Sequence, residues 1–476
     1  MPETPTDLGD LDAVASAELV RSGQVSALEL VDAAIARIEA TDPQLNAVIH
    51  RRYEAARDEA RRTPADLPFS GTPMLLKDVE LAGDPSFNGA RVYADLNRRC
   101  AVSDRFTERL QGAGAILLGL TNIPEFTSAA VTESQLHGPC RNPWDLERSP
   151  GGSSGGAAAA VASRMVPAAQ SSDGGGSSRI PASAVGAFTI KPGRGRTPLG
   201  PSGATWMDIT SSKSFITRSV RDTAALLDVV AGADPSETLA APALSRPLLQ
   251  EVGAAPGRLR IGVALSGPGG AVDPEAIEAV NQAAGLLEML GHRIEEAAPE
   301  TFLSEESRAI LAVYWPMKVA MRAAPAEQQL GREMAEGDLE PLTLAMLRYA
   351  RRKSMAEVGA ILVQIRDFTT RSLAWWASGY DLLLTPSTGA VPPLIGALAG
   401  RDEATRAANA RWAGLMPFAN ITGQPAASVP LHWTAQGLPI GVQLVADVCR
   451  EDVLVRVSAQ LEEARPWADR RPPVSA

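Results

Sequence analysis

Residues 149–162 read SPGGSSGGAAAAVA, and residues 171–183 read SSDGGGSSRIPAS. Glycine is costly to order and contributes no packing, so a dense run is typical of backbone that turns sharply or approaches another group closely. Serine adds hydroxyl groups that donate hydrogen bonds, accept them or act as nucleophiles. The two runs are therefore compatible with a flexible linker, a phosphate-binding loop or a pair of catalytic loops.

Two of these interpretations fit the surrounding sequence poorly. A P-loop requires a lysine directly after its last glycine, and neither run contains a lysine. A dinucleotide-binding loop directly follows a strand, whereas ERSPGGSSGG (147–156) follows a polar stretch. A linker is disfavoured because strongly apolar segments flank both runs. The pattern therefore favours catalytic loops.

The composition excludes several classes of function. The chain has 476 residues, of which 45% are hydrophobic and 21% charged, as expected for a soluble globular protein. Its net charge of −10 provides no basic excess for nucleic acid or an anionic membrane. Three scattered cysteines and four scattered histidines predict reduced thiols and no zinc site. The acidic N-terminus has no apolar segment, so we expect a cytoplasmic protein.

Alternating helix and strand patterns predict an α/β fold, with a mixed β-sheet core and helices on both faces. Ser26 and Glu29 form a capping-box pattern at the start of one such helix. Residues 302–378 differ, since they show long helical patterns without strands between them. We expect one domain over residues 1–476, with residues 302–378 as a helical excursion that faces the substrate.

A nucleophilic serine needs a base, and no histidine is near either run. Lys77 lies within the apolar stretch GTPMLLKDVE (71–80), and burial would favour its neutral form. Taken alone, such a lysine more often extends its ammonium group to solvent. Cys140 has no local base and is interpreted as a small buried residue.

The chain resembles the amidase signature family of serine amidohydrolases. The resemblance covers nearly the whole sequence and rests on these stretches: GTPMLLKD (71–78), GLTNIPEF (119–126), GPCRNPWD (138–145), the two serine–glycine runs and FANITGQPAASVPLHWTAQGLPIGVQLVA (418–446). Residues 17–38 and 450–467 make it most similar, within the family, to hydrolases of cyclic aminohexanoate dimers, the nylon-oligomer group. The resemblance implies the amidase signature fold.

The resemblance also implies a Ser–cisSer–Lys triad. By motif, the nucleophile is Ser177, which closes DGGGS (173–177); the bridging serine is Ser153 of GGSSGG (151–156); and the base is Lys77. Lys77 would accept the proton of Ser153 while Ser153 accepts that of Ser177. No metal or organic cofactor is expected.

Further residues are expected around this triad. The glycines before the nucleophile predict an oxyanion hole, formed by the backbone N–H groups of Gly174, Gly175, Gly176 and Ser177. We expect three neighbours to support these loops: Ser154, Asp173 and Arg179. Trp206, Trp315 and Trp375 would either line an apolar substrate pocket or pack in the core.

The resemblance implies hydrolysis of amide bonds in hydrophobic small-molecule or oligomeric amides, such as nylon-type oligomers and anilides. Carbamates, which a urethanase cleaves, and esters are open to the same attack. The alternative is the glutaminase subunit of a tRNA-dependent amidotransferase. We expect a small-molecule amide or carbamate as the partner, and neither nucleic acid nor a membrane. The sequence does not determine the oligomeric state, and a homodimer would be in keeping with it.

Overall fold

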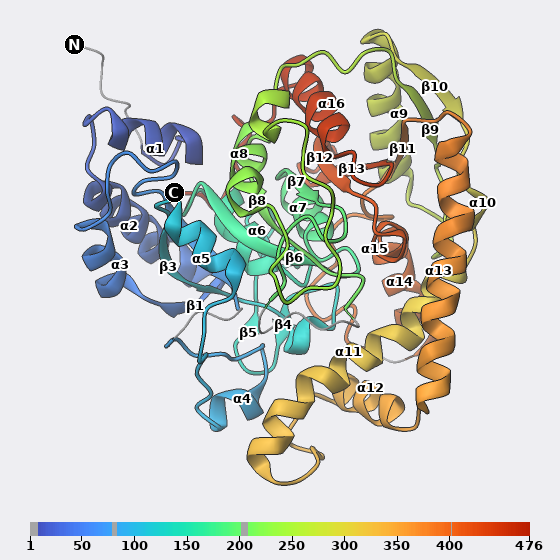
Figure 1. Cartoon of the computed structure of the whole chain (residues 1–476), viewed down its shortest axis with the longest axis horizontal. Coiled ribbons are helices and arrows are strands. Elements are labelled where there is room, and N and C mark those ends of the chain that lie inside the picture. The colour runs from blue at the N-terminus through green and yellow to red at the C-terminus, as the bar shows by residue number, and fades with distance from the viewer. Residues whose placement is uncertain (1–7, 79–82, 201–207, 401) are drawn as a thin grey trace.

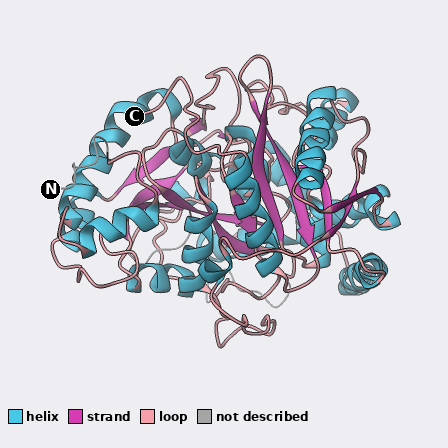
Figure 2. Ribbon diagram, turned by 90° about the horizontal axis from the view of Figure 1, so that it is seen from above, coloured by secondary structure: helices cyan, strands magenta, loops and turns pink. Residues whose placement is uncertain are grey.

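The structure is a computed structural model that describes residues 8–78, 83–200, 208–400 and 402–476. Its main strands form two sheets, and helices cover both sides of them (Figure 1, Figure 2). This arrangement confirms the predicted mixed α/β fold. Within these described ranges, no helix is long and apolar enough to cross a membrane.

The first sheet gathers the predicted site residues at one edge. Its strands lie in the order β1 (Val48–Arg51), β3 (Ile116–Thr121), β2 (Pro73–Lys77), β6 (Ala168–Asp173) and β8 (Ser212–Thr217). β2 is parallel to both β3 and β6, whereas β1 and β8 are antiparallel to their neighbours. The carboxyl ends of β3, β2 and β6 therefore meet at one edge, where Lys77 and Asp173 end their strands.

The second sheet continues from the first. Its order is β10 (Arg293–Glu296), β9 (Arg260–Val263), β11 (Leu382–Pro386), β13 (Pro439–Ala446), β12 (Ala426–Trp433) and β7 (Thr189–Lys191). Phe188, just before β7, and Thr217, at the end of β8, exchange two backbone hydrogen bonds of 2.9 and 3.0 Å. This link is in keeping with one domain, which stays a prediction. A short hairpin joins β4 (Glu133–Ser134) and β5 (Gly138–Pro139).

One helix begins where the sequence predicts it. The capping box of Ser26 and Glu29 is present. The helices outside the excursion are α1 (Ala13–Arg21), α2 (Ala27–Leu45), α3 (Tyr53–Ala60), α4 (Arg91–Asp95), α5 (Arg105–Gly112), η1 (Glu125–Thr127), α6 (Gly155–Ala162), α7 (Arg179–Val185), α8 (Val220–Val230), η2 (Leu248–Glu251), α9 (Pro274–Met289), α14 (Glu403–Ala413), α15 (Pro417–Thr422) and α16 (Glu451–Ala464).

Residues 302–378 are helical as predicted, and that they face the substrate stays a prediction. Residues 302–378, all of them described, contain the end of α10 (Glu300–Leu303), then α11 (Glu306–Leu330), α12 (Pro341–Arg351) and α13 (Met355–Ala377), with no strand between them. In Figure 1, α13 runs down the right side of the molecule, and α11 and α12 lie at the bottom, below the strands of the first sheet. One face of α11 thereby reaches the edge where Lys77 lies.

The two glycine runs lie in the interior, so a flexible linker is the wrong interpretation. Each run leads into a short buried helix: the first into α6 and the second into α7. All eight residues of α6 are buried. Its alanines leave little more than backbone between neighbouring elements, which lets the first run approach the strands of the first sheet closely.

Candidate active site

The amine of Lys77 is buried at the carboxyl end of β2. Its side chain is 1% exposed. Nζ donates to Ser153 Oγ at 2.8 Å, to Ser172 Oγ at 3.0 Å and to the Ser172 carbonyl oxygen at 3.3 Å. Burial, and next to it the charges of Arg322 and Lys318, hold the pKa of Lys77 well below its ordinary value. An amine in this setting can be neutral and accept a proton.

Ser153 lies next to Lys77 at the start of α6. It is fully buried, and the Gly152–Ser153 peptide bond is cis, as the resemblance implies. Only glycine fits before it, because a Cβ on Gly152 would lie 2.5 Å from the backbone nitrogen of Val131. Ser154 Oγ donates to the carbonyl oxygen of Ser172 at 3.4 Å, so it supports the second hydrogen-bond partner of Lys77.

Ser177 lies in the loop between β6 and α7. The Ser154 N–H donates to the Ser177 carbonyl oxygen at 3.1 Å, so the two serine–glycine runs contact each other. Ser177 is 9% exposed, whereas Ser153 is fully buried. The structure therefore brings both serines and Lys77 together. Lys77 and Ser153 share a hydrogen bond, whereas proton transfer from Ser177 through Ser153 to Lys77 stays a prediction.

A buried ion pair braces the Ser177 loop. Arg179 Nε donates to Asp173 Oδ2 at 2.9 Å and Nη2 donates to Oδ1 at 3.0 Å, with both side chains fully buried. Asn420 Nδ2 donates to Asp173 Oδ1 at 2.9 Å, and its Oδ1 accepts from Arg179 Nη2 at 2.7 Å. Burial alone would raise the pKa of Asp173, but Arg179 and Asn420 outweigh it and hold that pKa well below its usual range. The predicted supporting positions of Asp173 and Arg179 are thus in contact beneath the loop.

The loop presents backbone N–H groups beside Ser177. The amides of Gly174, Gly175 and Ser177 donate to no acceptor among the described residues. Gly176 differs from this expectation, because its N–H already donates to Asp173 Oδ1 at 2.7 Å. Its φ of +117° is a backbone conformation that favours glycine at this turn of the loop. Three of the four predicted donors therefore remain free for an oxyanion.

Helix α11 covers the glycine loop. A Cβ on Gly174 would lie 3.2 Å from the Trp315 ring and 3.0 Å from Lys318 Nζ, and a Cβ on Gly175 would lie 3.4 Å from Leu311 Cδ2. Leu311, Trp315 and Lys318 follow one face of the helix, at intervals of four and three residues. The Trp315 ring therefore lies against the glycine loop, and that it lines a substrate pocket stays a prediction.

The other two tryptophans have different outcomes. Trp375 stacks on Tyr380 with ring centroids 4.0 Å apart, and its ring lies against Gly262 of β9. It therefore packs beside the second sheet. Trp206 lies outside the described residues. Cys140 is fully buried, burial raises its thiol pKa, and the prediction of a small buried residue is confirmed.

Three further residues at the site were not predicted from the sequence: Ser172, Asn420 and Lys318. Ser172 had no clear signal in the sequence, because it directly precedes Asp173 in β6 and strand alternation places adjacent side chains on opposite faces. Lys318 is buried, and its Nζ donates to Asp208 Oδ1 at 2.9 Å and to Ser211 Oγ at 2.6 Å. Within the described part of the chain, no three His, Cys, Asp or Glu side chains form a group that could hold a metal ion.

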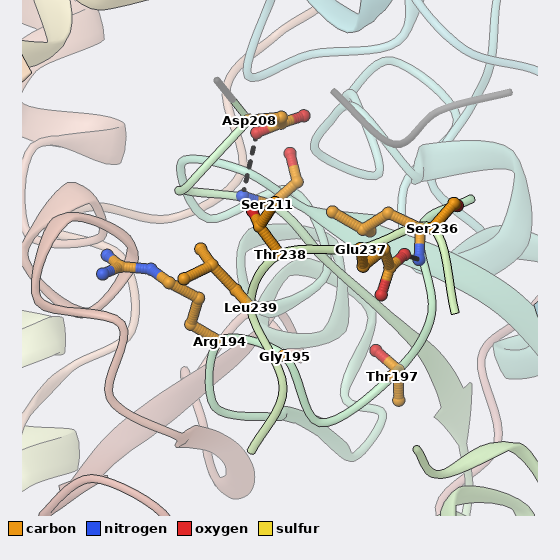
Figure 3. A pocket seen from close by; sticks show the side chains of 10 residues that line it. Arg194, Gly195, Thr197, Asp208, Ser211, Ser236, Glu237, Thr238 and Leu239 are labelled. Carbon is orange, nitrogen blue, oxygen red and sulfur yellow. Dashed lines mark hydrogen bonds between the residues drawn. The ribbon is translucent and has the colours of Figure 1, made fainter. Parts of the chain in front are cut away.

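Asp208 and Ser211, which accept from Lys318, also line a small cavity of about 50 Å³ (Figure 3). It is lined by Arg194, Gly195, Thr197, Leu199, Asp208, Ser211, Ser236, Glu237, Thr238 and Leu239. Figure 3 shows Asp208 and Ser211 side by side, joined by the hydrogen bond from the Ser211 N–H at 3.2 Å. None of Lys77, Ser153 and Ser177 lines this cavity, so it lies beside the proposed catalytic residues and not at them.

Replacing Arg179 with methionine is expected to lower the free energy of unfolding by about 3–5 kcal/mol, because Asp173 would stay buried without its cation. Chemical denaturation measures this loss. Arg366→Met is the matched control: its side chain is 76% exposed, so we expect a change within about 0.5 kcal/mol. Equal stabilities for the two variants would contradict the bracing role of Arg179.

Comparison with known proteins gives a consistent result. The amidase family model matches residues 29–455. The 6-aminohexanoate-cyclic-dimer hydrolase of Paenarthrobacter ureafaciens is 39% identical over 97% of this chain and 96% of its own. The structure of a 6-aminohexanoate cyclic dimer hydrolase complexed with substrate superimposes with a TM-score of 0.94 at 38% identity, covering 99% of this chain and 100% of the other.

More distant structures share the same fold. A bacterial aryl acylamidase of the amidase signature family has a TM-score of 0.86 at 27% identity, covering 96% of this chain and 97% of the other. One component of the glutamyl-tRNA(Gln) amidotransferase of Thermotoga maritima has a TM-score of 0.79 at 25% identity, covering 99% of both chains. The similarity to the stand-alone hydrolases is therefore greater than that to the amidotransferase component.

Proposed function

This chain belongs to the amidase signature family and is an amidohydrolase, and we propose that it cleaves hydrophobic small-molecule or oligomeric amides through an acyl-enzyme on Ser177. The observation that carries the mechanism is the 2.8 Å hydrogen bond between Lys77 and Ser153, next to the backbone of Ser177. A buried, neutral amine is a competent base for a serine hydroxyl.

The reaction begins when Ser177 Oγ attacks the carbonyl carbon of the amide. Its proton passes to Ser153, whose own proton passes to Lys77. The N–H groups of Gly174, Gly175 and Ser177 stabilise the negative charge on the carbonyl oxygen. The C–N bond then breaks, and the amine leaves with a proton returned through Ser153. Water attacks the resulting ester by the same relay and releases the acid.

The substrate class follows from the wall of the site and from the relatives. Leu311 and Trp315 place apolar surface beside Gly174 and Gly175, which suits an aliphatic or aromatic group next to the scissile bond. The named relatives act on a cyclic aminohexanoate dimer and on aryl acylamides. Carbamates and esters present the same electrophilic carbonyl, so urethanase activity belongs to this proposal.

A substrate panel tests the proposal. We expect native protein to release para-nitroaniline from its hexanoyl anilide, and to cleave the matching ethyl carbamate more slowly, because nitrogen and oxygen both donate electrons to a carbamate carbonyl. Steady-state kinetics of both substrates measure this. Silence on both substrates, with ammonia release from glutamine only when a partner protein is added, would instead support the amidotransferase alternative.

A further inference from the structure

Arg322 lies at the same sheet edge as Lys77, on the side away from the glycine loop. Its Nη1 donates to the carbonyl oxygen of Phe126 and to Thr127 Oγ1, both in η1, which follows β3. One turn earlier on α11, Lys318 stands against Gly174, which follows β6. Since β2 lies between β3 and β6, α11 crosses the edge with Lys77 between its two cations.

Lys318 and Arg322 differ in how many of their N–H groups have a hydrogen-bond acceptor. Lys318 Nζ has three acceptors: Asp208 Oδ1 at 2.9 Å, Ser211 Oγ at 2.6 Å and Thr210 Oγ1 at 3.2 Å. Its charge is paired and its three protons are engaged. The Nε and Nη2 atoms of Arg322 have no acceptor among the described residues, and no described carboxylate forms an ion pair with it.

The carboxylate of Glu125, in η1, does not form an ion pair with Arg322. Glu125 instead accepts the N–H of Glu340 at 2.8 Å, and burial raises the pKa of Glu125 to about 7. Arg322 is half-buried, burial lowers the pKa of its guanidinium, and its Nε and Nη2 are not fully enclosed by protein. The guanidinium is thus fixed through one nitrogen and offers a free edge beside the site.

We propose that Arg322 binds a carboxylate carried by the substrate at a distance from the scissile amide, so that the enzyme prefers amides with a free acid group. Nε and Nη2 present two parallel N–H groups, the fork that matches both oxygens of a carboxylate. An acid-terminated amide is also what cleavage of a cyclic oligomer yields. The inference rests on the proposed function and specifies its substrate class.

Two matched substrate pairs test this inference. One pair places the acid on the acyl side: glutaryl para-nitroanilide and the analogue with a methyl ketone in place of the carboxylate. The other places it on the amine side: hexanoyl para-aminobenzoate and hexanoyl para-aminoacetophenone. In one pair, native protein is expected to favour the acid by about tenfold in kcat/KM, the effect of one charged hydrogen-bonded contact. The preference for the acid substrate should appear mainly as a lower KM.

Arg322→Gln is expected to bring that ratio close to one, and Arg322→Lys to keep part of it. Arg366→Gln on α13 removes an exposed arginine and should leave the ratio unchanged. A native ratio near one in both pairs, or a ratio that survives in Arg322→Gln, overturns the inference. A merely structural role would slow acid and ketone equally and so preserve the ratio.

The substrates also separate this inference from the proposed function. If native protein cleaves the ketones without preferring the acids, amidase function stands and only the carboxylate site fails. If it cleaves none of the four substrates, both proposals fail.

Discussion

Ser177→Ala is expected to lower kcat/KM for hexanoyl para-nitroanilide by about 10⁴-fold or more, the usual cost of losing a serine nucleophile. The side chain makes no packing contribution that alanine could not replace, and it is 9% exposed on a loop held by Asp173. The loss should therefore appear in kcat, with stability unchanged. Steady-state kinetics and thermal unfolding together measure both.

Ser178→Ala is the matched control for this prediction. The neighbouring hydroxyl donates to Ser171 Oγ at 2.8 Å and is fully buried, so we expect a loss of about tenfold or less, that of one hydrogen bond. Mass spectrometry after rapid quenching should find the hexanoyl group on Ser177 in native protein. Acylation of another residue, or full activity in Ser177→Ala, would rule out Ser177 as the nucleophile.

Local helical patterns predicted the excursion, whereas the triad positions came from the resemblance to the amidase signature family, which rests on motifs that are visible in the sequence. Lys77 interrupts an apolar strand, and both serines lie in glycine runs. Asn420 has no such signal, since it is 247 residues from Asp173, to which it donates at 2.9 Å. Only the folded chain reveals that α15 supports the loop after β6.

Two further features could not be predicted from the sequence for a related reason: strand β6 and the bonded N–H of Gly176. β6 reads AAQSSD, and its polar residues are buried because Lys77, Asn420 and other groups satisfy them across elements. Propensity alone treats such a stretch as a loop. Gly176 was expected to be a free donor for a similar reason, because the bond of its N–H to the Asp173 carboxylate is a contact that only the folded loop shows.

Lys77→Met is expected to lower kcat/KM by about 10³-fold, within the range for loss of a general base. Methionine fills a similar volume without charge, and Lys77 has no paired carboxylate among the described residues, so the variant should be at least as stable as native protein. An activity loss without a stability loss would separate a catalytic role from a structural one.

The pH dependence gives the sharper test of the base. The pKa of Lys77 is held well below its ordinary value, first by burial and then by the charge of Arg322. Only the neutral amine accepts a proton, so native kcat/KM should fall as pH drops below that pKa and level off above it. Lys77→Met should lose this acidic limb. Arg322→Gln should shift it to higher pH, because removing a neighbouring positive charge favours the protonated amine. A limb that persists unchanged in Lys77→Met would assign the titrating base to another group and leave Lys77 as a structural donor to Ser153.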